Sequence, residues 1–245
     1  RGRRVSSPPE TLTSSRTIVS SDVTRLANLI RLSSQALPVG GYAYSSCMES
    51  AVCNGIVKDH VTAFEWISDL FNYGLCSLDL PALFLSSDAW NKNEPNIIES
   101  LNEYLQANRE TEEMLLEDLE MGKSLARILQ QIDACSPLFK EPSFVTQFAI
   151  AGAYWRIPVA ELAAGFSFNW IENQVLVVTK SLPLGQSKAQ WVLEKMIPQI
   201  SEGVDRSERI AQKQQKYEWK FGRSLPGVAI LSAQHEGIED RLYRS

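Results

Sequence analysis

The sequence is poor in side chains that bind metals. It has two histidines, His60 and His235, and neither stands at metal-ligand spacing from a cysteine. No two cysteines form a C-x-x-C pair, so neither a zinc site nor a redox pair is indicated. We therefore predict no metal ligands on this chain, and we expect its cysteines to be small, reduced and buried in a cytoplasmic protein. The four cysteines are Cys47, Cys53, Cys76 and Cys135.

The chain also lacks an excess of positive charge and a long apolar run. It has 24 Lys and Arg against 29 Asp and Glu, a net charge of -5, which argues against nucleic acid as the main partner. The most hydrophobic stretch, 159–178, is interrupted by Glu161 and Glu172, so it predicts a buried helix rather than a membrane span. The basic start is not followed by an apolar core, so we expect no signal peptide and a cytoplasmic location without membrane contact.

The alternation typical of β-strands is rare, and helical periodicity dominates from Asp22 onward. The pattern predicts an all-α, single-domain bundle of roughly ten helices over 22–233, followed by a C-terminal tail over 234–245. Residues 1–21 are rich in Ser, Thr, Pro and Arg, so we expect a disordered leader or a remnant of an engineered product there. Helices are expected from Asp22 through Leu32 and at 45–54, 59–76, 79–91, 95–107, 109–132, 143–155, 159–180, 187–200 and 205–215.

The predicted helix at 109–132 has an apolar stripe and an opposite charged face that we expect to be solvated. Within it, Met121–Ser124 matches the end of a phosphate-binding loop, but Glu117 stands where that motif needs its first glycine. An ordinary helical turn is therefore expected. Spacing assigns no Ser-His-Asp or Cys-His arrangement, so we predict no catalytic residue, with a small all-α enzyme as an alternative. The charged face consists of Glu112, Glu113, Glu117, Glu120, Lys123 and Arg127.

The segment Leu37–Ser45 is unusual for a helical bundle. Pro38 and the paired glycines that follow exclude a continuing helix and permit a tight backbone path. Tyr42 and Tyr44 come next, which suits either a loop packed by its own aromatic rings or a rigid loop that presents them to a protein partner. The composition leaves both possibilities open.

Polar side chains interrupt the apolar helix at 159–180. Glu172, Asn173 and Gln174 are consecutive, and each buried polar group without a partner would cost about 1–3 kcal/mol. These side chains therefore either form an internal network that holds neighbouring helices or face a partner or a channel.

The final residues, 234–245, combine polar groups with a small apolar face. Ile238 and Leu242 are four residues apart, and Tyr243 is adjacent. A helix this short is marginal in water, so the tail is either frayed or folds onto a partner.

The loop and the long charged helix resemble motifs of the UreF family of urease accessory proteins. Leu37–Glu49, LPVGGYAYSSCME, is similar to the family's opening signature L-P-V-G-G-F-S-Y-S-x-G-L-E. It departs from that signature at Tyr42, Ala43, Cys47 and Met48. The segment 107–129 resembles a family helix built around R-E-T and M-G-x-S-L-x-R-L.

The C-terminal half carries two further resemblances to the same family. Trp170–Gln186 is similar to W-x-E-N-Q-V-x-x-x-x-K-x-x-P-L-G-Q. The tail resembles the family ending R-H-E-T-Q-Y-S-R-L-F-R-S, with Tyr243 in place of Phe and departures at Gln234 and 237–240. The resemblance extends from about Thr24 to the end of the chain.

The resemblance implies an all-α homodimer that carries no nucleotide site. It implies a non-catalytic adaptor that binds a second accessory protein, UreD or UreH, and the nickel-carrying GTPase UreG. In this family the assembly docks on apo-urease and couples GTP hydrolysis to nickel insertion. Nickel and GTP are therefore expected on the partners, with no cofactor on this chain. A helical adaptor for another nickel or GTPase system is the alternative.

The resemblance also implies where partners bind. The tail would anchor UreD/UreH, while the loop at 38–49 and the segment 172–180 would form or buttress the surface presented to UreG and urease. Lys180 would be an ion-pair or gating position. The implied partner-binding residues are Tyr42, Tyr44, Ser45, Glu49, Glu172, Asn173, Gln174, Lys180, His235, Glu236, Arg241, Leu242, Tyr243 and Arg244.

Overall fold

The computed structural model describes residues 22–135, 138–238 and 241–244. Within these ranges it has ten α-helices, a 3-10 helix, a π-helix and no strand beyond an isolated bridge, which confirms the all-α prediction. The predicted leader over 1–21 and the last residue, Ser245, lie outside the described residues. The elements are α1 (Asp22–Leu32), η1 (Gly41–Ala43), α2 (Met48–Cys53), α3 (His60–Asp69), η2 (Leu70–Leu75), α4 (Asp79–Asn91), α5 (Pro95–Ala107), α6 (Glu112–Gln131), α7 (Phe144–Tyr154), α8 (Val159–Ser181), α9 (Gln186–Gln212) and α10 (Pro226–His235).

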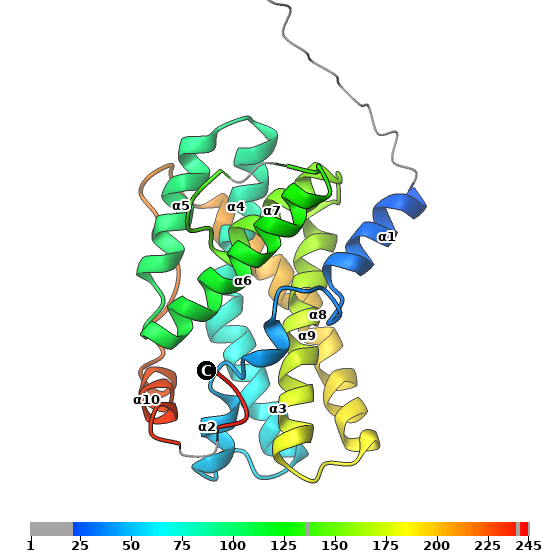
Figure 1. Cartoon of the computed structure of the whole chain (residues 1–245), viewed down its shortest axis with the longest axis vertical. Coiled ribbons are helices and arrows are strands. Elements are labelled where there is room, and N and C mark those ends of the chain that lie inside the picture. The colour runs from blue at the N-terminus through cyan, green and yellow to red at the C-terminus, as the bar shows by residue number, and fades with distance from the viewer. Residues whose placement is uncertain (1–21, 136–137, 239–240, 245) are drawn as a thin grey trace, which may run out of the picture.

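The long helices α8 and α9 pack against each other, and α4 packs against both of them and against α7. Helix α7 is buried along most of its length because α4, α6 and α8 surround it. Figure 1 shows α1 leaving the body on one side, whereas α2, α10 and the C-terminus lie toward the same end of the molecule. Helix α10 packs on α2 there, so residues 226–235 lie beside residues 48–53.

Local sequence signals set several helix starts. Asp59 accepts a hydrogen bond from the backbone amide of Thr62, whose hydroxyl accepts from the Asp59 amide, which makes a capping box for α3. Thr111 caps α6 with one such hydrogen bond, because its hydroxyl accepts from the backbone amide of Met114. Pro95 and Pro226 occupy the first turns of α5 and α10, where a missing backbone amide costs nothing.

Helix α9 is continuous, so the predicted break at 201–204 was wrong. Gly203 does not end the helix. It lets α9 approach η2, because a Cβ there would lie 2.6 Å from Sγ of Cys76 and 2.7 Å from Cε1 of Phe71. In sequence, a glycine that permits close helix packing looks the same as a helix stop.

Other boundaries also differ from the prediction. Helix α2 begins three residues later than expected, because Ser46 and Cys47 have φ of 47° and 69°, in the left-handed region. The helix predicted over 59–76 ends in the π-helix η2. Helix α10 was not predicted, although its initial proline was a signal for it. Residues 241–244 are not helical.

The cysteines are all free, and Cys47 and Cys76 are buried as predicted. Cys53 is exposed, contrary to the prediction, because it ends α2 at the surface. In the described ranges, no helix is both long and apolar enough to cross a bilayer. Over the same residues, no three His, Cys, Asp or Glu side chains gather in a way that could hold a metal ion.

Candidate functional site

The loop between α1 and α2 follows a constrained path and presents one of its two tyrosines. Gly40 has φ of 82°, a conformation that glycine adopts without strain, and it precedes the single turn η1. Tyr44 is buried, whereas 65% of Tyr42 is exposed. Tyr44 therefore packs the loop, as the first interpretation has it, whereas Tyr42 is exposed and its presentation to a partner stays a prediction.

The polar side chains of α8 hold this loop. Asn173 Nδ2 donates to the carbonyl of Tyr44 at 3.1 Å, and Gln174 Nε2 donates to the carbonyl of Ser45 at 3.1 Å. Gln174 and Ser45 are fully buried. Asn173 and Gln174 therefore belong to the internal network that the sequence allowed, which holds α8 against the loop.

Glu172 and Lys180 lie at the two ends of the predicted segment on α8. Glu172 is half-buried, and burial raises the pKa of its carboxyl, an effect that a hydrogen bond with Gln35 partly offsets. Lys180 is exposed, and its Nζ lies 5.9 Å from the ring centroid of Tyr243 in the tail. The lysine thus meets an aromatic face of the tail.

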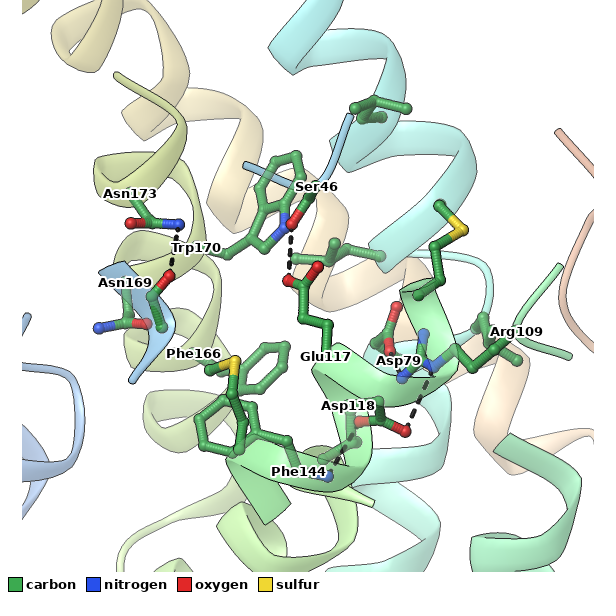
Figure 2. A pocket seen from close by; sticks show the side chains of 18 of the residues that line it. Ser46, Asp79, Arg109, Glu117, Asp118, Phe144, Phe166, Asn169, Trp170 and Asn173 are labelled. Carbon is green, nitrogen blue, oxygen red and sulfur yellow. Dashed lines mark hydrogen bonds and ion pairs between the residues drawn. The ribbon is translucent and has the colours of Figure 1, made fainter. Parts of the chain in front are cut away.

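Helix α6 closes the other side of the loop. Ser46 Oγ donates to Glu117 Oε1 at 2.8 Å, and Figure 2 shows the two side chains pointing toward one another. The prediction that the charged face of α6 is solvated was wrong for Glu117 and for Glu113, whose side chain is 11% exposed. The loop and α10 cover these two carboxylates.

The tail returns to the loop and to α2. Glu49, which is buried, accepts hydrogen bonds from the backbone amides of Leu242 at 2.8 Å and Tyr243 at 3.2 Å. The amide of Arg244 donates to the carbonyl of Ala43 at 2.8 Å. The ring of Tyr243 is buried, whereas 69% of Leu242 is exposed. The described part of the tail therefore packs on its own chain.

His235, at the end of α10, is fully buried and lies against Glu49, the residue that also binds the tail. Its Nε2 is 2.9 Å from Glu49 Oε2. Glu236 and Arg241, also predicted to bind partners, are exposed on either side of it, and Arg241 Nη1 donates to Glu113 Oε1 at 3.2 Å. The structure thus brings the loop, α6, α8 and the tail together, and the sequence motifs found in all four meet.

A cavity of about 190 Å³ lies behind the loop, between α6, α8 and the start of α4. Its walls are partly aromatic, from Phe144, Phe166 and Trp170 (Figure 2). Its charged floor includes Asp79 and Asp118, which both pair with Arg109.

The positive charge of Arg109 neutralises part of the negative charge of Asp79 and Asp118 on that floor. Its Nη2 is 2.8 Å from Asp79 Oδ1 and its Nε is 3.3 Å from Asp118 Oδ2. Burial alone would lower the pKa of Arg109, but the charges of Asp118 and Asp79 raise it above its ordinary value. Asp118 also accepts from Ser143 Oγ at 3.0 Å, so this cluster ties α6 to the start of α7.

Sequence reasoning missed Glu113, Glu117 and the pairing of Arg109 with Asp79 and Asp118. For Asp118 a signal was present, since it precedes the buried Gly122 by four residues and so lies on the apolar side of α6. For the two glutamates there was none, because their burial depends on segments distant in sequence.

Comparison with known proteins identifies the relatives of this chain. The UreF family model matches residues 57–197. A urease accessory protein UreF of Hahella chejuensis is 38% identical over 223 residues, which cover 90% of this chain and 98% of that protein. The proteins of the same name from a Marinomonas species and from Polynucleobacter asymbioticus are 39% and 38% identical, each over 93% of this chain. The chain therefore belongs to the UreF family of urease accessory proteins.

Proposed function

We propose that this chain is a non-catalytic adaptor of urease maturation that links the UreD/UreH accessory protein to the GTPase UreG. Its relatives are named urease accessory proteins, which supports action together with urease. Nickel and GTP are carried by the partners, the chain works as a homodimer in the cytoplasm, and the assembly acts on apo-urease.

The observation that carries this proposal is the junction of the loop with the tail. The hydrogen bond from Arg244 to Ala43 makes the two segments one surface, although they are about two hundred residues apart in the chain. We call this the composite surface; its exposed side chains come from the loop, from the last turns of α8 and from the tail. They are Tyr42, Leu176, Lys180, Leu242 and Arg244.

The composition of this surface suits a protein partner. Tyrosine and arginine side chains, here Tyr42 and Arg244, are enriched where the binding energy of an interface concentrates. Leu242 and Arg244 project from backbone that Glu49 and Ala43 hold, so they lose little freedom when a partner covers them. Tyr243 is turned inward, so it anchors the tail rather than contacting a partner directly.

We assign the two parts of the composite surface to different partners. The tail, through Leu242 and Arg244, binds UreD/UreH. The loop, through Tyr42, faces UreG and urease, with Lys180 between the two parts beside the ring of Tyr243.

The test is assembly in solution, measured by size-exclusion chromatography with light scattering. The chain is mixed with UreD/UreH, and then with UreG, GTP and nickel. We expect a complex with paired copies of each protein, and we expect the double variant Leu242→Ala, Arg244→Ala to weaken UreD/UreH binding at least about tenfold.

The matched control is Ile197→Ala, Arg209→Ala, which removes an exposed aliphatic and an exposed arginine side chain from α9. This control should assemble as the wild type does. The proposal is wrong if the chain elutes alone under every condition, or if the tail variant and the α9 variant bind UreD/UreH equally well.

A further inference from the structure

His235 lies between two carboxylates in the interior of the protein. Its Nε2 is 2.9 Å from Glu49 Oε2, and its Nδ1 is 3.2 Å from Glu113 Oε2. The side chain of His235 is 0% exposed, and those of Glu49 and Glu113 are 5% and 11% exposed. Each ring nitrogen of His235 is therefore within hydrogen-bond distance of a carboxyl group from a different helix. We call these three residues the His235 cluster.

The same two carboxylates bind the tail. Glu49 accepts from the amides of Leu242 and Tyr243, and Glu113 Oε1 lies 3.2 Å from Nη1 of Arg241. The two carboxyl groups thus contact both the imidazole of His235 and the tail. The cluster joins four separate parts of the chain: α2, α6, the end of α10 and the tail.

We infer that the His235 cluster is a positioning device that holds the tail against the loop and thereby assembles the composite surface. Glu49 binds the tail backbone directly, whereas His235 and Glu113 act through it and through Arg241. This inference rests on the proposed function for its effect on partner binding, but the positioning itself concerns the isolated chain.

The electrostatics favour this assignment over a purely architectural one. A buried carboxylate is costly unless paired, and removing one member of a buried charged group leaves the others uncompensated. Among the contacts described, Glu113 touches the tail only through Arg241, and it also lies against Nδ1 of His235. A neutral side chain of the same shape at this position should therefore release the tail without emptying the core.

The experiment is amide hydrogen exchange of the full chain, read by mass spectrometry in the C-terminal peptide. The amides of Leu242 and Tyr243 are donors to Glu49, so their exchange reports tail docking directly. We expect Glu113→Gln and His235→Gln each to accelerate exchange in this peptide at least about tenfold, since the first removes the ion pair with Arg241 and the second removes the ring that packs between Glu49 and Glu113.

Three further variants test whether the effect is specific to the His235 cluster. Glu112→Gln makes the same chemical change on the exposed neighbour in α6 and should leave exchange in the C-terminal peptide unchanged. Arg241→Gln alters a side chain that is 39% exposed, so folding is preserved, and it should also accelerate exchange in the tail. In the double variant Glu113→Gln, His235→Gln, the acceleration should be smaller than the product of the two single effects, because the paired groups act on one another.

The inference is overturned if exchange in the C-terminal peptide is the same in wild type, Glu113→Gln, His235→Gln and Arg241→Gln. It is also overturned if exchange accelerates equally in every peptide, because the cluster would then support the core and not the tail. Affinity for UreD/UreH, measured on the same proteins, separates this inference from the proposed function. If the tail is released but the affinity is unchanged, the positioning stands and the proposed partner surface fails.

Discussion

Arg109 links the start of α4 to α6 through two buried ion pairs. It bridges Asp79 at the start of α4 and Asp118 in α6, and all three side chains are at most 15% exposed. We expect Arg109→Ala to lower the free energy of unfolding by about 3–5 kcal/mol, because two buried carboxylates lose their counter-charge. Denaturant unfolding followed by circular dichroism measures the change.

The control for that prediction is Arg209→Ala on the exposed face of α9, which should change the free energy by less than about 0.5 kcal/mol. If Arg109→Ala were as mild as this control, the buried pairs would contribute nothing to stability and the assignment of the cavity floor would be wrong.

The cysteines differ in reactivity because burial differs. Burial, reinforced by the charge of Glu117, raises the pKa of the Cys47 thiol to about 12, and burial raises that of Cys76 to about 11. Both groups are therefore thiols at pH 8, and the thiolate is the reactive form. We expect iodoacetamide at pH 8 to label the exposed Cys53 in the native protein while Cys47 and Cys76 stay unmodified.

Mass spectrometry of the labelled peptides distinguishes the sites, and labelling in denaturant supplies the positive control. If Cys47 were labelled as fast as Cys53 in the native protein, the start of α2 would have to open readily. That result would contradict the buried position of Cys47.

Among the elements, α6 can approach the start of α7 closely because Gly122 has no side chain. A Cβ on Gly122 would lie 1.9 Å from the backbone oxygen of Pro142. Although alanine favours helix more than glycine does, Gly122→Ala should lower the free energy of unfolding by about 1–3 kcal/mol, because the two helices would be forced apart. Thermal unfolding measures the effect.

Gly227 in α10 is the matched control, since a Cβ there meets nothing within 4 Å. Gly227→Ala should stabilise the protein by up to about 1 kcal/mol through helix propensity alone. Equal effects of the two substitutions, in either direction, would show that the approach of α6 to α7 is not what requires a glycine.

Most of the helices could be predicted from the sequence because they depend on local signals. The capping residues Asp59 and Thr111 and the apolar stripe of α6 place helix starts and buried faces without knowledge of the fold. The errors arise where tertiary contacts decide. The predicted break at 201–204 is one example, because the residues that Gly203 packs against, Phe71 and Cys76, are distant in sequence.

At the scale of the whole molecule, the sequence indicated which segments matter but not that they meet. The loop, the polar residues of α8 and the tail each stood out for composition or for resemblance to a family. Their convergence rests on contacts such as Glu49 with Leu242 and Glu117 with Ser46, which no local pattern encodes. Contacts with Ser46 and with His235 likewise leave two expected surface glutamates of α6, Glu117 and Glu113, partly buried at the site.

The composite surface can be tested with two tyrosines that are almost equally exposed. Tyr42 in the loop is 65% exposed, and Tyr217, in the turn after α9, is 60% exposed. Both can be replaced by alanine with little effect on the core, so any difference between them reports on binding.

The deciding measurement is the affinity of these variants for UreG in the presence of UreD/UreH, determined by titration calorimetry. We expect Tyr42→Ala to weaken binding at least about tenfold, or roughly 1.4 kcal/mol, and Tyr217→Ala to leave it unchanged. Wild-type affinity in Tyr42→Ala, or an equal loss in both variants, would contradict the claim that the loop and tail form the partner-binding surface.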